Sequence, residues 1–311
     1  MVKIETVQHK SNADGCLLHG DLYLPDSAQA FVFLIHGMAE YRKRYRAYAE
    51  SLAGQNYQVL TMDLRGHGDS PCDGLMGYWG DSKGLERQLL DFIDCIKKFN
   101  RQALPVFIFG HSMGSLWARL ILQNYPELAS AYLLSGSPGK NIKEDAVLSA
   151  VSGLASGLSL LGPKTPAKFI AENMNKAFLK KLEKPLTKYD WLSFDRDNII
   201  SYIEDPLCGF PFTRSGYKTL AELYEAVYSN QDWPVKRADL PILFISGGQD
   251  PVAKIEADAL SAAVQDLISK GYQNVRLRIY PESRHEVFFD QQKAQVWQDS
   301  FDFFNAQKSK A

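Results

Sequence analysis

The chain has 311 residues, of which 35 are lysine or arginine and 36 are aspartate or glutamate, so its formal net charge is −1. A charge this close to zero provides no broad basic field of the kind that nucleic acid or an anionic membrane surface would attract, so we do not expect polyanionic partners. The length fits one α/β core that carries an insertion.

The amino-terminal segment and the cysteines indicate in which cellular compartment the protein is expected. MVKIETVQHKSN lacks the apolar core that a signal peptide needs. The longest uncharged stretch, residues 146–163, is too rich in serine and glycine for a membrane span. The four cysteines, which form no CxxC pair, are Cys16, Cys72, Cys95 and Cys208. We therefore expect a cytoplasmic protein with free thiols and no metal. Peripheral association with the membrane surface is an open alternative.

Short apolar runs alternate with segments of helical length along most of the chain. Several of these runs are continuous, which is typical of strands buried on both faces of a sheet. The alternation predicts a mostly parallel sheet with helices on both faces. The predicted strands are residues 16–24, 30–37, 57–64, 104–110, 131–137, 241–247 and 275–281.

The alternation breaks once, between residues 138 and 235, where prolines separate helices and loops. Because the strand pattern resumes at Pro241, we interpret residues 138–235 as a helical cap. The core would then comprise residues 1–137 and 236–311.

The stretch FIFGHSMGSL, residues 107–116, places a serine between two glycines where a buried strand meets a helix. A G-x-S-x-G turn needs glycines because side chains would collide there, and it exposes the serine at the strand tip. Ser112 is therefore the candidate nucleophile. A chance Gly-Ser turn is the plain alternative, and the flanking strand and helix favour the catalytic interpretation.

A serine hydroxyl needs a base, and the base needs an orienting acid. His285 is the only histidine that follows Ser112, and it lies in the loop after a predicted strand. Asp250 follows the preceding strand in SGGQDPV, and it is the candidate acid. Asp239 and Asp258 are weaker candidates, and a turn or helix-cap role is the plain alternative for Asp250.

Acyl transfer also needs two donors for the oxyanion. The backbone N–H groups of Met113 and Met38 occupy the expected places, directly after the nucleophile and in the loop after strand 30–37. We expect His36 to hold that loop rather than act as a second base. We also expect Glu40 to pair with an arginine near the end of the sheet.

Several motifs occur in an order that resembles the α/β-hydrolase superfamily, and more narrowly its monoacylglycerol lipase and lysophospholipase branch, which is also grouped with serine aminopeptidases. They are HGMAEYRKRY (36–45), MDLRGHGDS (62–70), GHSMGS (110–115), LSFDRDNIISYIEDPLCGF (192–210), SGGQDPV (246–252) and SRHE (283–286).

The resemblance implies an eight-stranded α/β-hydrolase fold with a helical cap over the active site. It places Ser112, Asp250 and His285 in a catalytic triad and Met38 and Met113 in the oxyanion hole, with no cofactor. Tyr41 departs from the pattern, because members of this branch commonly have histidine there. Residues that flank the oxyanion loop are candidates to contact the polar end of the substrate.

Within the cap, larger apolar residues recur at helical spacing from Val147 to Leu161. Packing on the core is the plain interpretation, and the alternative is that Leu154 and Leu158 guide an acyl chain or rest transiently on a membrane. We predict a serine hydrolase of monoacyl lipid esters. An aminopeptidase that uses Glu204, Asp205 and Glu222, a small-ester esterase and a non-catalytic binding protein are the alternatives.

Overall fold

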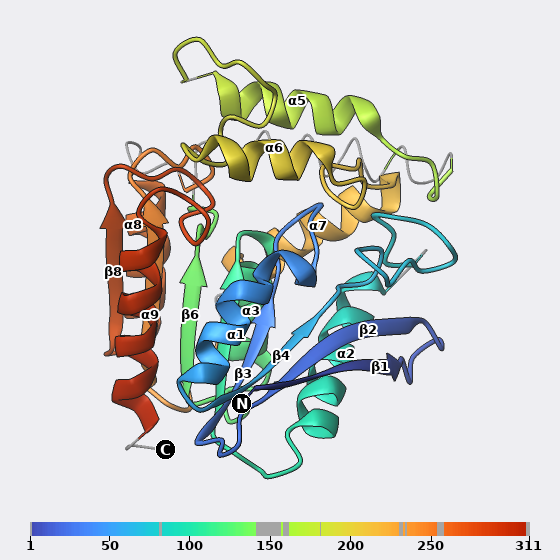
Figure 1. The fold of residues 1–311 in the computed structure, drawn as a ribbon. Helices are drawn as coiled ribbons and strands as arrows, with labels where there is room; N and C mark the ends of the chain where they lie inside the picture. The colour runs from blue at the N-terminus through green and yellow to red at the C-terminus, as the bar shows by residue number, and fades with distance from the viewer. Residues whose placement is uncertain are drawn as a thin grey trace.

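Eight strands form one sheet in the computed structural model, in the order β1-β2-β4-β3-β5-β6-β7-β8 (Figure 1). β2 runs antiparallel to β1 and β4, and the other neighbours are parallel. The strands are β1 (Lys3–Lys10), β2 (Leu17–Leu24), β3 (Ala30–Ile35), β4 (Tyr57–Met62), β5 (Val106–His111), β6 (Ala131–Ser135), β7 (Ile242–Gly247) and β8 (Val275–Tyr280). The structure describes residues 2–80, 83–140, 157, 162–180, 182–229, 233, 235–253 and 258–308.

The sheet confirms the predicted mostly parallel α/β architecture and each of the seven predicted strands. β1 is the difference, since the sequence pattern predicts no strand before residue 16. β1 is an edge strand whose side chains are mostly exposed or half-buried. It therefore lacks the continuous apolar run that marks the inner strands. In β3, β5 and β7, by contrast, every residue is buried.

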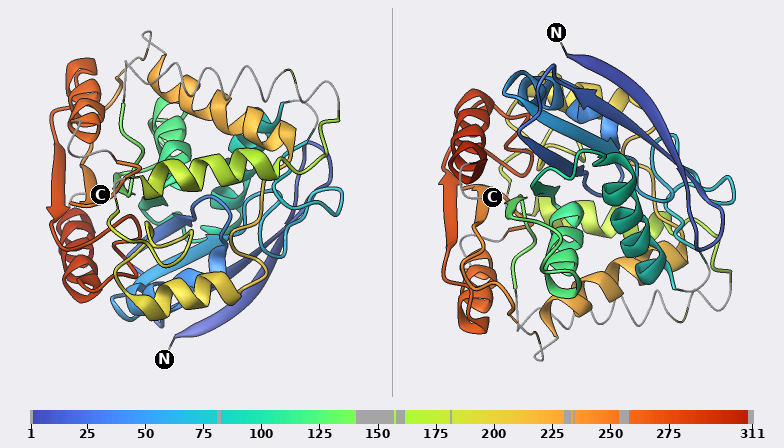
Figure 2. Two further views of the ribbon diagram at one scale, coloured as in Figure 1. Left: turned by 90° about the horizontal axis from the view of Figure 1, so that it is seen from above. Right: turned by 90° about the horizontal axis from the view of Figure 1, so that it is seen from below.

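Helices cover both faces of the sheet, as Figure 2 shows for α8 and α9 on opposite sides of β8. Buried side chains of α1 and α9 pack in one apolar cluster, and those of α2, α3 and α8 pack in another. The core helices are α1 (Arg46–Gly54), α2 (Gly84–Phe99), α3 (Met113–Asn124), α8 (Ala259–Lys270) and α9 (Lys293–Lys308), with a short 3-10 helix η1 (Arg42–Tyr45) before α1.

Helices α5 (Lys168–Leu179), α6 (Arg196–Glu204) and α7 (Arg214–Tyr228) lie between β6 and β7 in sequence. Figure 1 shows α5 and α6 above the carboxyl ends of the parallel strands. We call residues 162–210 the cap segment. Part of it has its own small apolar cluster, which includes Trp191 and Tyr202, whereas α7 packs its buried side with α3. Within the described ranges, every helix is too short or too polar to cross a bilayer.

Cys16 and Cys72 form a disulfide with a Cα–Cα distance of 5.7 Å, which corrects the expectation that all four thiols are free. Cys95 and Cys208 are free. The two bonded residues are 56 positions apart in sequence, so no local motif marks the pair. They meet because the loop after β4 folds back on β2, where the His19 amide donates to Ser70 Oγ at 2.8 Å. The argument from cysteine spacing to a reducing compartment therefore fails.

Removing this disulfide should lower the thermal stability of the protein. Closing a loop of this length typically contributes about 2 to 4 kcal/mol, because it restricts the unfolded chain. A Cys16→Ser/Cys72→Ser variant should then melt about 4 to 10 °C below the oxidised wild type in calorimetry. The matched control is reductant, which should lower the wild-type melting temperature and leave that of the variant unchanged. Equal melting temperatures with and without reductant in the wild type would contradict the bond.

Candidate active site

The turn between β5 and α3 holds Ser112 in a conformation that few residues adopt, with φ 51° and ψ −119°. A Cβ on Gly110 would lie 2.3 Å from the carbonyl oxygen of Gly114, and one on Gly114 would lie 2.2 Å from that of Ile35. Both positions therefore require glycine, for the reason that the sequence predicts. The Ser112 amide donates to the Ser135 carbonyl oxygen at 2.8 Å, which ties the turn to β6.

His285 and Asp250 meet in the loops that follow β8 and β7. The ring nitrogen Nδ1 of His285 lies 3.1 Å from Asp250 Oδ1 and 3.0 Å from Oδ2. Asp250 Oδ1 also accepts from the amide of Val252 at 2.8 Å. Asp250 therefore both stabilises the turn and contacts the histidine, because one carboxylate can accept several hydrogen bonds. Of the weaker candidates, Asp239 is exposed near Arg237 and Asp258 precedes α8.

A cavity of about 1240 Å³ brings the predicted site residues together beneath the cap segment. Its lining includes Ser112, Asp250 and His285, and also Met38 and Met113. Most of the exposed lining is apolar, with Ile170, Met174, Phe178, Trp191 and Leu220 among the contributing side chains. Leu154 and Leu158, the predicted substrate contacts, lie outside the described residues.

The electrostatic surroundings of His285 favour its protonated form. Burial alone would lower the pKa of this imidazole, but the carboxylate of Asp250, with Glu286 and Glu40 beyond it, raises the pKa above its ordinary value. A base whose pKa is raised toward neutrality accepts a proton more readily and still returns it. Because Nδ1 contacts Asp250, Nε2 is the ring nitrogen that the sequence prediction requires as the base.

Two other histidines lie close to the site in neutral form. Burial lowers the pKa of His36 and of His111 well below the ordinary value. His36 Nε2 accepts from the Leu64 amide at 3.0 Å, so Nδ1 carries the proton and donates to the Gly37 carbonyl oxygen at 2.8 Å. His36 thus holds the loop after β3, as expected. The His111 ring lies 4.8 Å from that of His285, a contact that sequence reasoning missed because His111 precedes the nucleophile.

A buried charge cluster lies behind His285. Arg44 Nη1 lies 2.5 Å from Glu40 Oε2 and 2.5 Å from Glu286 Oε1. All three side chains are at most 9% exposed. Glu40 therefore pairs with an arginine, as predicted, whereas the role of Glu286 was missed. The only sequence signal was its position next to His285.

Tyr41 points away from the cavity, toward the cap segment. Its hydroxyl donates to Asp205 Oδ2 at 2.8 Å, and Tyr41 is absent from the cavity lining. This position therefore offers no contact to the polar end of a substrate, in contrast to what its place beside the oxyanion loop suggests. Among the described residues, no group of three His, Cys, Asp or Glu side chains could hold a metal ion.

The model of one protein family, described as serine aminopeptidase S33, matches residues 26–292. The chain belongs to this family. Among its relatives, the monoacylglycerol lipase of Mycolicibacterium smegmatis is 26% identical over 90% of this chain and 89% of its own. The monoglyceride lipase of Mus musculus is 28% identical over 93% of this chain and 90% of its own.

Solved structures of an esterase and of a lipase have the same fold. A thermostable carboxyl esterase from Bacillus coagulans, in complex with glycerol, aligns with a TM-score of 0.86 and 25% identity over 98% of this chain and 99% of its own. A monoglyceride lipase from Saccharomyces cerevisiae, solved with a substrate analogue, aligns over 97% of this chain and 95% of its own, with a TM-score of 0.75 and 18% identity. The eight-stranded sheet of this family member is thus the α/β-hydrolase sheet.

Neutralising Glu286 should shift the pH dependence of this S33 hydrolase. The Glu286 carboxylate helps to raise the pKa of His285, so Glu286→Gln should lower that pKa. The base must be unprotonated to act, so activity should persist to lower pH than in the wild type. The measurement is the acid limb of kcat/KM against pH with p-nitrophenyl butyrate. Asp302→Asn, which neutralises an exposed carboxylate on α9, is the matched control and should leave the limb in place. If the acid limb of Glu286→Gln lies at the same pH as in the wild type, or at a higher pH, this electrostatic account is refuted.

Proposed function

We propose that this S33 family member is a serine ester hydrolase that cleaves monoacylglycerols through an acyl-enzyme. The observation that carries the proposal is that the strained Ser112 turn and the His285–Asp250 pair line one large, mostly apolar cavity. An acyl chain requires apolar lining, whereas the reacting ester requires the nucleophile and a base at the same place. The printed names of the relatives from Mycolicibacterium smegmatis and Mus musculus support this substrate class.

The chemistry assigns one role to each polar group. Ser112 Oγ attacks the ester carbonyl carbon while His285 Nε2 takes the hydroxyl proton, and Asp250 holds the imidazole in the required tautomer. Negative charge moves to the carbonyl oxygen, where the N–H groups of Met38 and Met113 would stabilise it. The bond to the alcohol then breaks, the alcohol leaves with the proton from His285, and the acyl group stays on Ser112.

Water completes the cycle by the same steps in reverse order. His285 takes a proton from the water, whose oxygen attacks the acyl carbon. The Ser112–acyl bond breaks, the fatty acid leaves, and Ser112 regains its proton from His285. Every step uses groups of this chain and water alone.

Replacement of the nucleophile tests the proposal directly. Ser112→Ala should lower monoacylglycerol hydrolysis by at least about 10³-fold and abolish labelling by a fluorophosphonate probe, because the proposed mechanism places the nucleophilic oxygen on Ser112. Circular dichroism and the melting temperature should match those of the wild type. Labelling that persists in Ser112→Ala would place the nucleophile elsewhere, and a wild type without ester turnover would favour a binding protein.

A substrate panel separates the enzyme alternatives. The panel compares monooleoylglycerol, oleoyl lysophosphatidylcholine, p-nitrophenyl acetate and an aminoacyl-naphthylamide. The residues predicted to hold a free amine, Glu204, Asp205 and Glu222, do not line the cavity, so the sequence-based reason for aminopeptidase activity is lost. Preferential turnover of the naphthylamide would overturn the lipase proposal. Preferential turnover of lysophosphatidylcholine would show that the substrate is a lysophospholipid rather than a monoacylglycerol.

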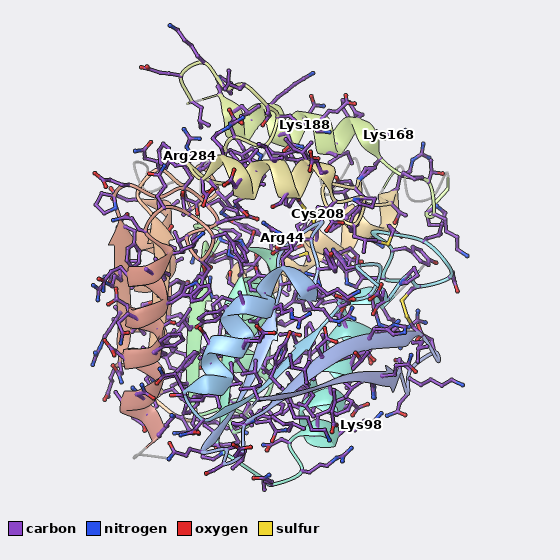
Figure 3. The ribbon with its side chains drawn as sticks, in the orientation of Figure 1. Arg44, Lys98, Lys168, Lys188, Cys208 and Arg284 are labelled. Carbon is purple, nitrogen blue, oxygen red and sulfur yellow. A yellow bond between two sulfur atoms is a disulfide. The ribbon has the colours of Figure 1, made fainter. Side chains whose placement is uncertain are left out.

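We also propose that the cap segment touches a lipid surface. Phe169 on α5 is 59% exposed and Leu186 in the following loop is 80% exposed. Exposed lysines occur along the same segment, and Figure 3 shows Lys168 and Lys188 on its outer side. The lysines are Lys164, Lys168, Lys176, Lys180, Lys184 and Lys188, against exposed Glu172 and Glu183. Although the net charge of the whole chain is close to zero, this segment is locally basic, and exposed apolar side chains among lysines are typical of proteins that rest on anionic lipid. A cytoplasmic location remains a prediction.

Leu186→Ser should weaken this lipid contact. We expect the bound fraction on vesicles of phosphatidylcholine and phosphatidylserine to fall severalfold, since burial of a leucine side chain contributes about 1.5 to 3 kcal/mol. Turnover of p-nitrophenyl acetate should be unchanged. The control is Ile279→Ser, which removes an exposed apolar side chain from the edge strand β8 rather than from the cap segment. Equal binding by both variants would show that the cap segment does not rest on lipid.

A further inference from the structure

Helix α6 directs Asn198 and Tyr202 toward the protein interior and leaves two of its three isoleucines partly exposed. Asn198, Tyr202 and the adjoining Asp205 recur at helical spacing, and each contacts the core. Ile200 and Ile203, on the other side, are each 45% exposed. A surface helix ordinarily buries such isoleucines, whereas α6 buries only Ile199 of the three. Local rules of this kind tend to be broken where a segment has a functional task.

The inward side of α6 contacts the loop that would carry the Met38 N–H group. The Tyr202 hydroxyl donates to the Ala39 carbonyl oxygen at 2.9 Å, and the Gly209 amide donates to the same oxygen at 2.8 Å. Ala39 has a φ of 53°, in the left-handed region that costs an alanine conformational energy. Two donors from the cap segment therefore fix a carbonyl in a loop that would not favour this conformation alone.

A second contact lies on the other side of the same loop. Asp205, just after α6, accepts from the Tyr41 hydroxyl at 2.8 Å and from the Leu207 amide at 2.8 Å. The second bond sets the turn that leads to Gly209. Tyr41 and Ala39 are thus both tied to one short turn of the cap segment.

Arg44 completes the attachment between core and cap. Its Nη2 donates to Asn198 Oδ1 at 2.9 Å, and Asn198 Nδ2 donates to Glu286 at 2.7 Å. The guanidinium lies between the rings of Tyr202 and Phe289, at 4.9 and 4.7 Å. Figure 3 shows Arg44 and Cys208 between the sheet and α6. The charge cluster behind His285 therefore also holds α6.

We propose that α6 and residues 205–209 act as a clamp that positions the oxyanion loop, with Tyr202 and Tyr41 as positioning residues. The inference rests on the proposed acyl-transfer function, because it assigns the loop to oxyanion stabilisation. Donors stabilise an oxyanion only when they are held close to its final position. The clamp holds Ala39, and through it the adjacent Met38 N–H, before substrate arrives.

The test replaces each hydroxyl without removing its ring. Tyr202→Phe and Tyr41→Phe should each lower kcat for p-nitrophenyl butyrate about tenfold, less than the loss of a whole oxyanion donor. Inhibition by butylboronic acid, which forms a tetrahedral adduct on serine, should weaken by a similar factor, and KM should change less than about twofold. Rates are divided by the concentration of active sites that react with a fluorophosphonate, so that unfolded protein does not contribute.

Controls separate positioning from stability. Tyr57→Phe also removes one hydrogen bond, between Tyr57 and Asn305 at the far end of the sheet, and should leave kcat per active site unchanged. In Asp205→Asn the amide oxygen can still accept from the Leu207 amide while the NH2 group donates to the Tyr41 hydroxyl oxygen, so this variant should retain most activity. Asp205→Ala loses both contacts and should resemble Tyr41→Phe. Unchanged kcat and boronate affinity in both tyrosine variants would overturn the clamp. A wild type that neither hydrolyses the ester nor reacts with the fluorophosphonate would instead refute the proposed function.

Discussion

The close contact between the nucleophile turn and β3 is the constraint on which the rest of the site depends. Gly114 lies so near the carbonyl oxygen of Ile35 that a Cβ would approach it to 2.2 Å, so α3 begins directly against the end of β3. The same approach brings Ser112 beside Gly37, where a Cβ would lie 3.3 Å from that of the serine. The proposed nucleophile and the proposed oxyanion loop are therefore neighbours through backbone packing alone.

Charged side chains next to His285 then determine features of the site that backbone packing does not. Burial of an arginine with two glutamates is costly and is weak support for stability. Burial raises the pKa of Glu40, whereas for Glu286 the effect of Arg44 and Asn198 outweighs burial and lowers the pKa. Glu286 is thus the more firmly ionised partner, and it lies next to the histidine whose pKa it helps to raise. The cluster is therefore better explained by its electrostatic effect on His285 and its contacts with α6 than by a contribution to folding stability.

The sequence predicts features that local pattern and chain order determine. Continuous apolar runs mark β3, β5 and β7, and the glycines around Ser112 mark its turn, because both depend on neighbouring residues. The order of Ser112, Asp250 and His285 along the chain then selects residues that the structure brings to one cavity. By contrast, Arg44 meets Glu286 across 242 positions, and Cys16 meets Cys72 across 56. No spacing rule reports such contacts, and the half-exposed β1 lacks the pattern of a buried strand.

Helix α6 shows why the cap segment is the hardest part to predict. Its sequence offers Ile199, Ile200 and Ile203 as candidates for burial, yet only Ile199 is fully buried. The helix is instead oriented by polar bonds from Asn198, Tyr202 and Asp205 to groups that belong to the catalytic loops. Those partners come from segments more than 80 residues away in either direction, so hydrophobic periodicity carries no information about them. The orientation of α6 follows from the loop geometry that the site requires, and the exposure of its isoleucines is the consequence.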